Sequence, residues 1–205
     1  MEHTIEQIGR AGIIVILRNR CEEFITEHLP RLAGTGLQVI EVSRSAEKYA
    51  SALKSLTTKW NQQLLIGVGT VRTKADAEEA IGAGAQFLIS PHFDPLLTEF
   101  VVKQCVPYIV GCYTPSEVMA AQNLGPAAIK IFPAFLGGHK YIKALLAPIP
   151  EARLVPTGGV SPADAWEYWK AGAWAVAIGS EMNSVISDNG WTDDQLKALF
   201  AGKGK

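Results

Sequence analysis

Short apolar runs alternate with amphipathic segments along the whole 205-residue chain, and this alternation constrains the fold more than any other feature. We predict eight strands, at residues 12–17, 37–42, 63–68, 86–90, 107–110, 127–132, 153–157 and 174–178. The segments between them have helical spacing, at residues 21–33, 46–58, 73–83, 94–104, 114–123, 138–147, 162–171 and 191–201. Candidate helix N-caps are Thr73, Ser116 and Ser161. Strands that alternate with helices predict a parallel sheet with helical cover.

Eight such units in a chain of this length favour a compact α/β fold of the (β/α)8 TIM-barrel type. A doubly wound open sheet is the structural alternative. No linker or composition break divides the chain, so we expect a single barrel domain over residues 1–205. Residues 1–11 are predicted to form a short N-terminal helix, and residues 202–205 a frayed tail.

Charge and composition exclude several classes of function. The formal net charge of -1 gives no global field that would attract nucleic acid or an anionic membrane. The N-terminus lacks the apolar core of a secretory signal, and no apolar run approaches a membrane span of about 18 residues. The three cysteines form neither a CxxC motif nor a disulfide framework, and no histidine pairs with another histidine or a carboxylate at metal-ligand spacing. We therefore expect a cytoplasmic protein without a metal site.

Lys130 is a cation within an apolar run, where burying an unpaired ammonium is costly. Side chains alternate along a strand, so Lys130 shares a face with Ala128 and Phe132. Ile129 and Ile131 take the other face, which would point Lys130 into a barrel. A desolvated lysine loses its proton more easily, and the neutral amine can form a Schiff base with a ketone. The strand pattern alone leaves a structural ion pair equally open.

Glu41 ends the second predicted strand in a similar way and shares a face with Val39. A carboxylate that projects into the mouth of a barrel can serve as general acid or base. It could equally be the ion-pair partner of Lys130 or Arg18, and one residue could have both roles.

Glycine-containing segments follow the seventh and eighth predicted strands. PTGGV contains Thr157, Gly158 and Gly159, and IGS contains Gly179 and Ser180. Glycines let backbone N–H groups approach an anion closely, and a helix N-terminus adds partial positive charge. Loops at these positions of a (β/α)8 barrel commonly bind phosphate, so we predict a phosphate site there.

The motif IGVGT, at residues 66–70, has a superficial likeness to a nucleotide-binding loop. It lacks the third glycine of GxGxxG and the lysine of a P-loop, which argues against a nucleotide site. We interpret its glycines as allowing close packing near the barrel axis and presenting the hydroxyl of Thr70.

Seven motifs occur in this order along the chain: EVS, GVGTV, ISP, TPSE, KIFPA, PTGGVSP and AIGS. Together they resemble the class I 2-keto-3-deoxy-6-phosphogluconate (KDPG) aldolases and their relatives acting on the 6-phosphogalactonate epimer. The similarity extends from about Ile13 to Ser180, and KIFPA and PTGGVSP are its most specific parts. The resemblance implies a (β/α)8 barrel, a homotrimer, and cleavage of a phosphorylated 2-keto-3-deoxy sugar acid to pyruvate and glyceraldehyde 3-phosphate.

The resemblance also implies roles for single residues. Lys130 matches the Schiff-base lysine, and Glu41 matches the general acid/base. The positions matching substrate contacts are Thr70, Pro91 and Phe132 around pyruvate, Gly158, Gly159, Gly179 and Ser180 at phosphate, and Arg18, which is similar to the phosphogalactonate branch. The lysine adduct takes the place of a Lewis acid, so this chemistry needs no metal or organic cofactor.

One departure from the family pattern follows Glu41. The segment EVSRSAE places Ser45 where the family commonly has Arg, or Asn in the phosphogalactonate branch, and an arginine stands one residue earlier, at Arg44. Either Arg44 or Arg18 is then a candidate for holding the substrate carboxylate.

Three other functions stay open: a 4-hydroxy-2-oxoglutarate aldolase with the same mechanism, a sugar-phosphate isomerase or epimerase, and an inactive sugar-phosphate-binding barrel.

Overall fold

The computed structural model describes residues 1–18, 21–182 and 190–202. Its strands are β1 (Ile13–Leu17), β2 (Val39–Ser43), β3 (Leu65–Gly69), β4 (Leu88–Ile89), β5 (Tyr108–Cys112), β6 (Ala128–Ile131), β7 (Leu154–Pro156) and β8 (Val176–Ile178). All pairings are parallel, in the order β7-β6-β5-β4-β3-β2-β1-β8. A bridge between Thr157 and Ala177 brings the two outer strands together, so the sheet forms a nearly closed barrel. The predicted (β/α)8 barrel is confirmed, and the doubly wound sheet is excluded.

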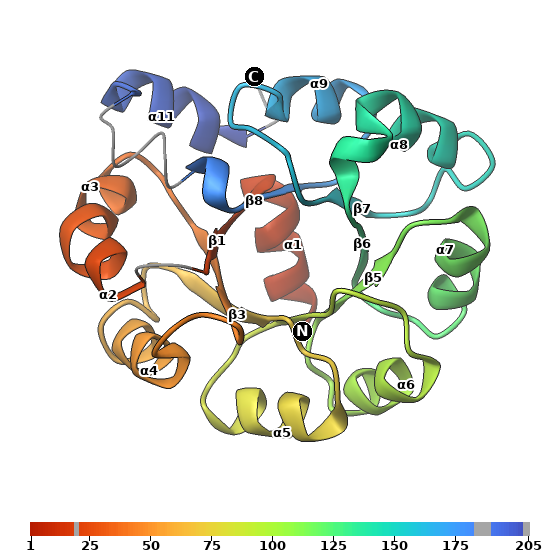
Figure 1. Ribbon diagram of the computed structural model, residues 1–205, viewed down its shortest axis with the longest axis horizontal. Coiled ribbons are helices and arrows are strands. Elements are labelled where there is room, and N and C mark those ends of the chain that lie inside the picture. Colours follow the sequence, from red (N-terminus) through yellow and green to blue (C-terminus); the bar gives the residue numbers. More distant parts are fainter. Residues whose placement is uncertain (19–20, 183–189, 203–205) are drawn as a thin grey trace.

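Helices form an outer ring around the strands, except α1, which lies at the centre of the ring (Figure 1). They are α1 (Glu2–Ala11), α2 (Cys21–Glu23), the π-helix η1 (Phe24–His28), α3 (Leu29–Gly34), α4 (Tyr49–Lys59), α5 (Lys74–Gly82), α6 (Pro95–Lys103), α7 (Pro115–Gln122), the 3₁₀ helix η2 (Ala134–Leu136), α8 (Gly138–Leu146), α9 (Ala165–Lys170) and α11 (Asp193–Phe200). The single helix predicted at 21–33 is therefore three consecutive pieces, and η2 was not predicted.

The apolar core has two layers, because strand side chains alternate between the barrel interior and the helices. The inner layer comprises Ile14, Ile16, Val39, Leu65, Phe87, Ile89, Ile109, Ala128, Val155, Ala175 and Ala177. Ile8 and Ala11 of α1 join this layer, and α1 lies at the centre of the ring in Figure 1. Since α1 directly precedes β1, it closes the amino-terminal end of the barrel and leaves the carboxyl ends of the strands for a site.

The outer layer confirms the predicted alternation on the two strands that carry Glu41 and Lys130. Ile40 and Val42 of β2 pack against the helices, and so do Ile129 and Ile131 of β6. The side chains between them point inward, which places Glu41 and Lys130 in the barrel interior.

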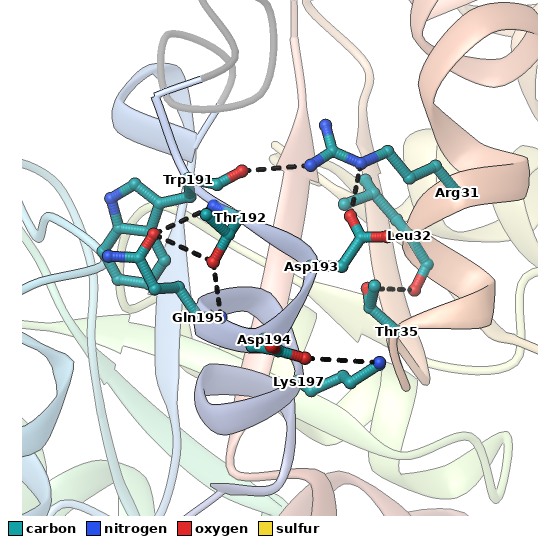
Figure 2. Close-up of polar contacts among 9 residues, drawn as sticks. All are labelled: Arg31, Leu32, Thr35, Trp191, Thr192, Asp193, Asp194, Gln195 and Lys197. Atoms are coloured by element: carbon teal, nitrogen blue, oxygen red, sulfur yellow. Dashed lines mark hydrogen bonds and ion pairs between the residues drawn. The ribbon is translucent and has the colours of Figure 1, made fainter.

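Contacts between α3 and α11 connect two helices that are far apart in the sequence (Figure 2). Arg31 Nε donates to Asp193 Oδ1 at 2.7 Å, and Arg31 Nη2 donates to the carbonyl of Trp191 at 3.0 Å. Thr192 and Gln195 form a capping box at the start of α11: the Thr192 side chain accepts from the Gln195 amide, and the Gln195 side chain accepts from the Thr192 amide. These contacts secure the last described helix on the outside of the barrel.

Within the described ranges, no helix combines the length and the apolar character that a membrane span requires. Of the predicted frayed tail, residues 203–205 lie outside the described residues. The assignment of residues 1–205 to one domain stays a prediction.

Candidate active site

Lys130 and Glu41 are ionisable side chains in the largely apolar interior of the barrel. Lys130 on β6 is 5% exposed, and Glu41 on β2 is 2% exposed. The Lys130 Nζ lies 5.0 Å from the centroid of the Phe132 ring. Glu41 Oε2 is buried and has no hydrogen-bond partner among the described residues. A buried carboxyl oxygen without a partner is costly, and such groups often mark a site that another molecule completes.

Burial shifts the pKa values of both groups toward their uncharged forms. It lowers the pKa of the Lys130 ammonium, which the nearby positive charge of Arg18 lowers further and Glu41 partly restores. Burial also raises the pKa of the Glu41 carboxyl, against the opposing attraction of Lys130 and Arg18. Desolvation is the largest cause in each case. Both shifts are toward the uncharged forms, and an uncharged amine can act as a nucleophile and an uncharged carboxyl as a proton donor.

Glycines on β3 make room for the side chains of Glu41 and Phe87. A Cβ atom at Gly69 would lie 1.5 Å from Glu41 Oε1, and one at Gly67 would lie 2.3 Å from the Phe87 ring. The predicted role of the glycines in IGVGT, close packing near the barrel axis, agrees with this geometry. At β5, a Cβ on Gly111 would lie 2.3 Å from the carbonyl carbon of Pro91, so Pro91 lies against the end of β5.

A cavity of about 270 Å³ lies at the carboxyl ends of β1, β7 and β8. It is lined by Ile16, Arg18, Phe132, Thr157, Gly158, Gly159, Gly179, Ser180 and Glu181. Seven of these residues were predicted from the sequence as substrate contacts; Ile16 and Glu181 were not. Gly158 and Gly159 have φ values of 87° and 66°, in the left-handed region that favours glycine. Their conformation directs this loop along the cavity.

Thr157 lines the cavity, but its hydroxyl proton is used within its own strand. Thr157 Oγ1 donates to the carbonyl of Val155 at 3.1 Å, and the side chain is 3% exposed. Arg18, in contrast, is exposed at the end of β1 and provides the positive charge among the described cavity-lining side chains. An anion entering the cavity would therefore meet Arg18 and the glycine-rich backbone.

Thr70 belongs to a hydroxyl cluster at the ends of β2 and β3, outside that cavity. Ser43 Oγ lies 2.8 Å from Thr70 Oγ1 and 2.8 Å from Ser45 Oγ. Ser43 was missed by the sequence reasoning. The available signal was its position two residues after Glu41 on the same strand, which puts both side chains on the inner face.

Arg44 points away from the barrel interior. Its guanidinium pairs with Asp76 at 3.0 Å and Glu79 at 2.8 Å, both on α5, and lies 5.3 Å from the centroid of the Tyr49 ring. These contacts raise the pKa of Arg44, against the cost of burial, which is the largest single influence. Of the two arginine candidates left open by the sequence, only Arg18 faces the cavity.

One group of possible metal ligands was not anticipated from the sequence. Glu23, Glu27 and His28 place ligand atoms within 4.8 Å of one another at α2 and η1. No such group was predicted from the sequence. Exposed acidic side chains are common without an ion, so the expectation that the protein has no metal site stays a prediction. The cluster is separate from the inner face that carries Lys130.

Comparisons with known proteins agree with this geometry. A family model described as "KDPG and KHG aldolase" matches residues 4–195. The KHG/KDPG aldolase of Escherichia coli (strain K12) is 34% identical over 155 residues, or 75% of this chain and 72% of that protein. The 2-dehydro-3-deoxy-6-phosphogalactonate aldolase of the same strain is 26% identical over 171 residues, or 83% of each protein.

A solved structure of KDPG aldolase from Legionella pneumophila, described with pyruvate captured as a covalent carbinolamine intermediate, superposes with a TM-score of 0.81. It is 26% identical in sequence and covers 97% of this chain and 96% of that one. The family model spans most of the chain, and the fold and the sequence similarity agree with it. The chain therefore belongs to the KDPG and KHG aldolase family, whose members are lyases.

Proposed function

We propose that the protein is a class I aldolase that cleaves a 2-keto-3-deoxy-6-phospho sugar acid to pyruvate and glyceraldehyde 3-phosphate through an iminium on Lys130. The observation that carries this proposal is the buried lysine on the inner face of β6, with a lowered pKa and a buried carboxyl nearby. The Legionella pneumophila relative, with pyruvate captured as a carbinolamine, supports the same covalent chemistry.

The proposed reaction begins when the neutral amine of Lys130 attacks the C2 ketone and forms a carbinolamine. Glu41 donates a proton as water leaves, and the iminium that results withdraws electrons from the C3–C4 bond. Loss of the C4 hydroxyl proton breaks this bond, and the electron pair passes to the iminium as an enamine. Glyceraldehyde 3-phosphate leaves, the enamine takes a proton at C3, and hydrolysis releases pyruvate and the free amine.

The cavity at β1, β7 and β8 is proposed to hold the phosphate. Arg18 and the Gly158–Gly159 backbone line it and offer a positive charge and hydrogen-bond donors, whereas Ser180 Oγ donates to Glu181 Oε2 at 3.3 Å. Phosphate lies far from the bond that breaks, so its binding energy orients the substrate at Lys130. Because Phe132 contributes to the cavity and also lies beside Lys130, it connects the two parts of the site.

A second candidate substrate is 4-hydroxy-2-oxoglutarate, which the same mechanism would cleave to pyruvate and glyoxylate. The family name includes KHG, and Arg18 could bind a distal carboxylate in place of phosphate.

A turnover panel tests these proposals. We would measure kcat/KM for 2-keto-3-deoxy-6-phosphogluconate, its 6-phosphogalactonate epimer and 4-hydroxy-2-oxoglutarate, with the wild-type protein and Lys130→Arg. We expect a phosphorylated substrate to be preferred, and Lys130→Arg to be inactive because a guanidinium stays protonated. Activity retained in Lys130→Arg would refute the lysine mechanism. An isomerase or epimerase would cleave none of these substrates and would keep its own activity after treatment with pyruvate and borohydride. Thermal stabilisation by these ligands with no turnover would indicate an inactive sugar-phosphate-binding barrel.

We also infer that the protein forms a homotrimer in the cytoplasm, as the resemblance to the family implies. Phe135 and Leu136, on η2 at the mouth of the barrel, are 62% and 63% exposed, which supports cover by another copy of the chain. Light scattering coupled to gel filtration measures the mass of the assembly. A monomeric mass at micromolar concentration would contradict the trimer and leave the proposed chemistry untouched.

A further inference from the structure

We propose that Ser90 is a positioning residue for the Schiff-base reaction: its hydroxyl holds the Pro91–His92 peptide against the inner face of β5, as a wall of the pocket beside Lys130. The inference rests on the proposed function and deepens it. It gives a role to a fully buried hydroxyl that neither the strand pattern nor the family resemblance assigns.

The Ser90 hydroxyl joins two backbone groups at the point where the chain leaves the sheet. Strand β4 has only two residues, and its pairing with β5 continues one step further, where the Ser90 amide donates to the carbonyl of Ile109 at 3.1 Å. The next amide of β5 on this side, that of Gly111, donates to Ser90 Oγ at 3.1 Å in place of a backbone carbonyl. The hydroxyl in turn donates to the carbonyl of His92 at 2.8 Å, which closes the turn.

Gly111 allows the Pro91–His92 peptide to lie on the inner face of β5. Ile109 belongs to the inner layer of the core, so Gly111, two residues further along the strand, faces inward as well. A Cβ atom at Gly111 would lie 2.3 Å from the carbonyl carbon of Pro91 and 2.5 Å from the nitrogen of His92. The peptide therefore occupies the space that a side chain on β5 would fill.

This peptide lies beside the strand that carries Lys130. Gly111 and Lys130 are Cα partners in the parallel pairing of β5 with β6, and neighbouring strands are about 4.8 Å apart. Both residues face the barrel interior, so a ketone bonded to the Lys130 amine has the Pro91–His92 peptide at its side. Pro91 is half-buried, which leaves this wall accessible to a ligand.

Loss of the Ser90 hydroxyl should release the wall from β5. The Gly111 amide and the His92 carbonyl would lose the partner that they share, and a buried polar group without a partner is costly. The turn should therefore shift until these groups find water or another partner. A misplacement of about 1 Å beside the reacting atoms can cost about 10²-fold in rate. Ser90 acts through this placement of the backbone, and its own hydroxyl takes no part in the chemistry.

The experiment measures how fast pyruvate forms the adduct on Lys130, by quenching with borohydride after increasing times at several pyruvate concentrations. Ser90→Ala should lower the rate constant at saturation about 10- to 100-fold and change the half-saturating concentration less than about threefold. Ser90→Thr keeps the hydroxyl and should restore most of the lost rate. Gly111→Ala pushes the same peptide away from β5 and should lower the rate constant in the same way.

Thr35→Val is the matched control for a loss of stability. The Thr35 side chain is 6% exposed, and its hydroxyl donates to the carbonyl of Leu32 at 2.9 Å. This bond lies at the end of α3, across the ring from β5 (Figure 1). The variant should unfold at a lower temperature and form the adduct at the wild-type rate. Ser90→Cys keeps nearly the same volume but bonds only weakly, and it replaces Ser90→Ala in the comparison where the alanine variant does not fold.

Two results would overturn the inference while leaving the proposed function standing. One is a folded Ser90→Ala or Ser90→Cys protein that forms the adduct at the wild-type rate. The other is an equal fall in rate for the Ser90 variants and Thr35→Val, which would show that lost stability alone explains the effect. Failure of the folded wild-type protein to form any adduct would instead refute the Lys130 chemistry, and the inference with it.

Discussion

Replacing Gly69 by alanine should inactivate the enzyme by moving a carboxyl group on the neighbouring strand. The added Cβ would lie 1.5 Å from Glu41 Oε1 and 2.2 Å from Glu41 Cδ, whereas ordinary contacts begin at 3.4 Å. The carboxyl must therefore move by roughly 2 Å, and the barrel interior around it is filled. A misplacement of about 1 Å can cost about 10²-fold in rate, and loss of general acid–base catalysis typically costs about 10²- to 10⁴-fold. We expect kcat to fall within that range.

The assay follows pyruvate release from the best substrate of the turnover panel, alongside thermal unfolding of each variant. Gly82→Ala is the matched control, because nothing lies within 4 Å of the added Cβ and the residue ends α5. It should keep full activity and gain up to about 1 kcal/mol in stability. Glu41→Gln removes the proton donor without adding volume and should lose activity to a similar degree. A folded Gly69→Ala protein with kcat within threefold of wild type would refute the role given to Glu41.

Three further predictions follow from the pKa shifts, the ion pairs and the glycine-rich loop. Burial lowers the pKa of Lys130 below the ordinary lysine value of 10.5. The rate of pyruvate adduct formation, measured by stopped flow, should therefore fall as pH decreases, with a midpoint below 10.5. A midpoint at or above 10.5 would contradict this prediction. Arg44→Ala should lower the free energy of unfolding by about 1 kcal/mol, because the ion pair with Glu79 is lost. It should leave kcat/KM within about twofold of wild type. A large rise in KM would mean that Arg44 binds substrate. Gly159→Ala places a Cβ on a residue with a φ of 66° and only 2.6 Å from Phe135 Cβ. The KM for the phosphorylated substrate should therefore rise about tenfold, while pyruvate trapping stays unchanged. An equal loss in trapping would show that the loop also shapes the Lys130 site.

The inward direction of Lys130 and Glu41 could be predicted from the sequence because strand side chains alternate with a period of two. No knowledge of the tertiary structure was needed for that step. The direction of Arg44 could not be predicted, because it depends on where α5 places Asp76 and Glu79. The contact between Ser43 and Thr70 could not be predicted either, because it joins the ends of two different strands, with the hydroxyl oxygens 2.8 Å apart.

The observed helix starts show which sequence signals were sufficient to predict a helix N-cap. Thr73 was predicted as an N-cap and is one, with Asp76 completing a capping box. Ser116 was predicted at α7 and is wrong: Thr114 caps that helix, and Pro115 takes its first turn. The capping box formed by Thr114 and Glu117 was present in the sequence and was overlooked. The π-helix at Phe24–His28 had no comparable signal in the sequence.

Borohydride trapping with pyruvate, followed by peptide mass spectrometry, tests the central claim most directly. The account predicts one stable adduct per chain on Lys130, because burial lowers the pKa of this amine and so favours its nucleophilic, uncharged form. It also predicts that the adduct disappears in Lys130→Ala, with no other lysine modified in its place. An adduct on a different lysine, or no adduct in a folded wild-type protein, would contradict the assignment of Lys130 as the nucleophile.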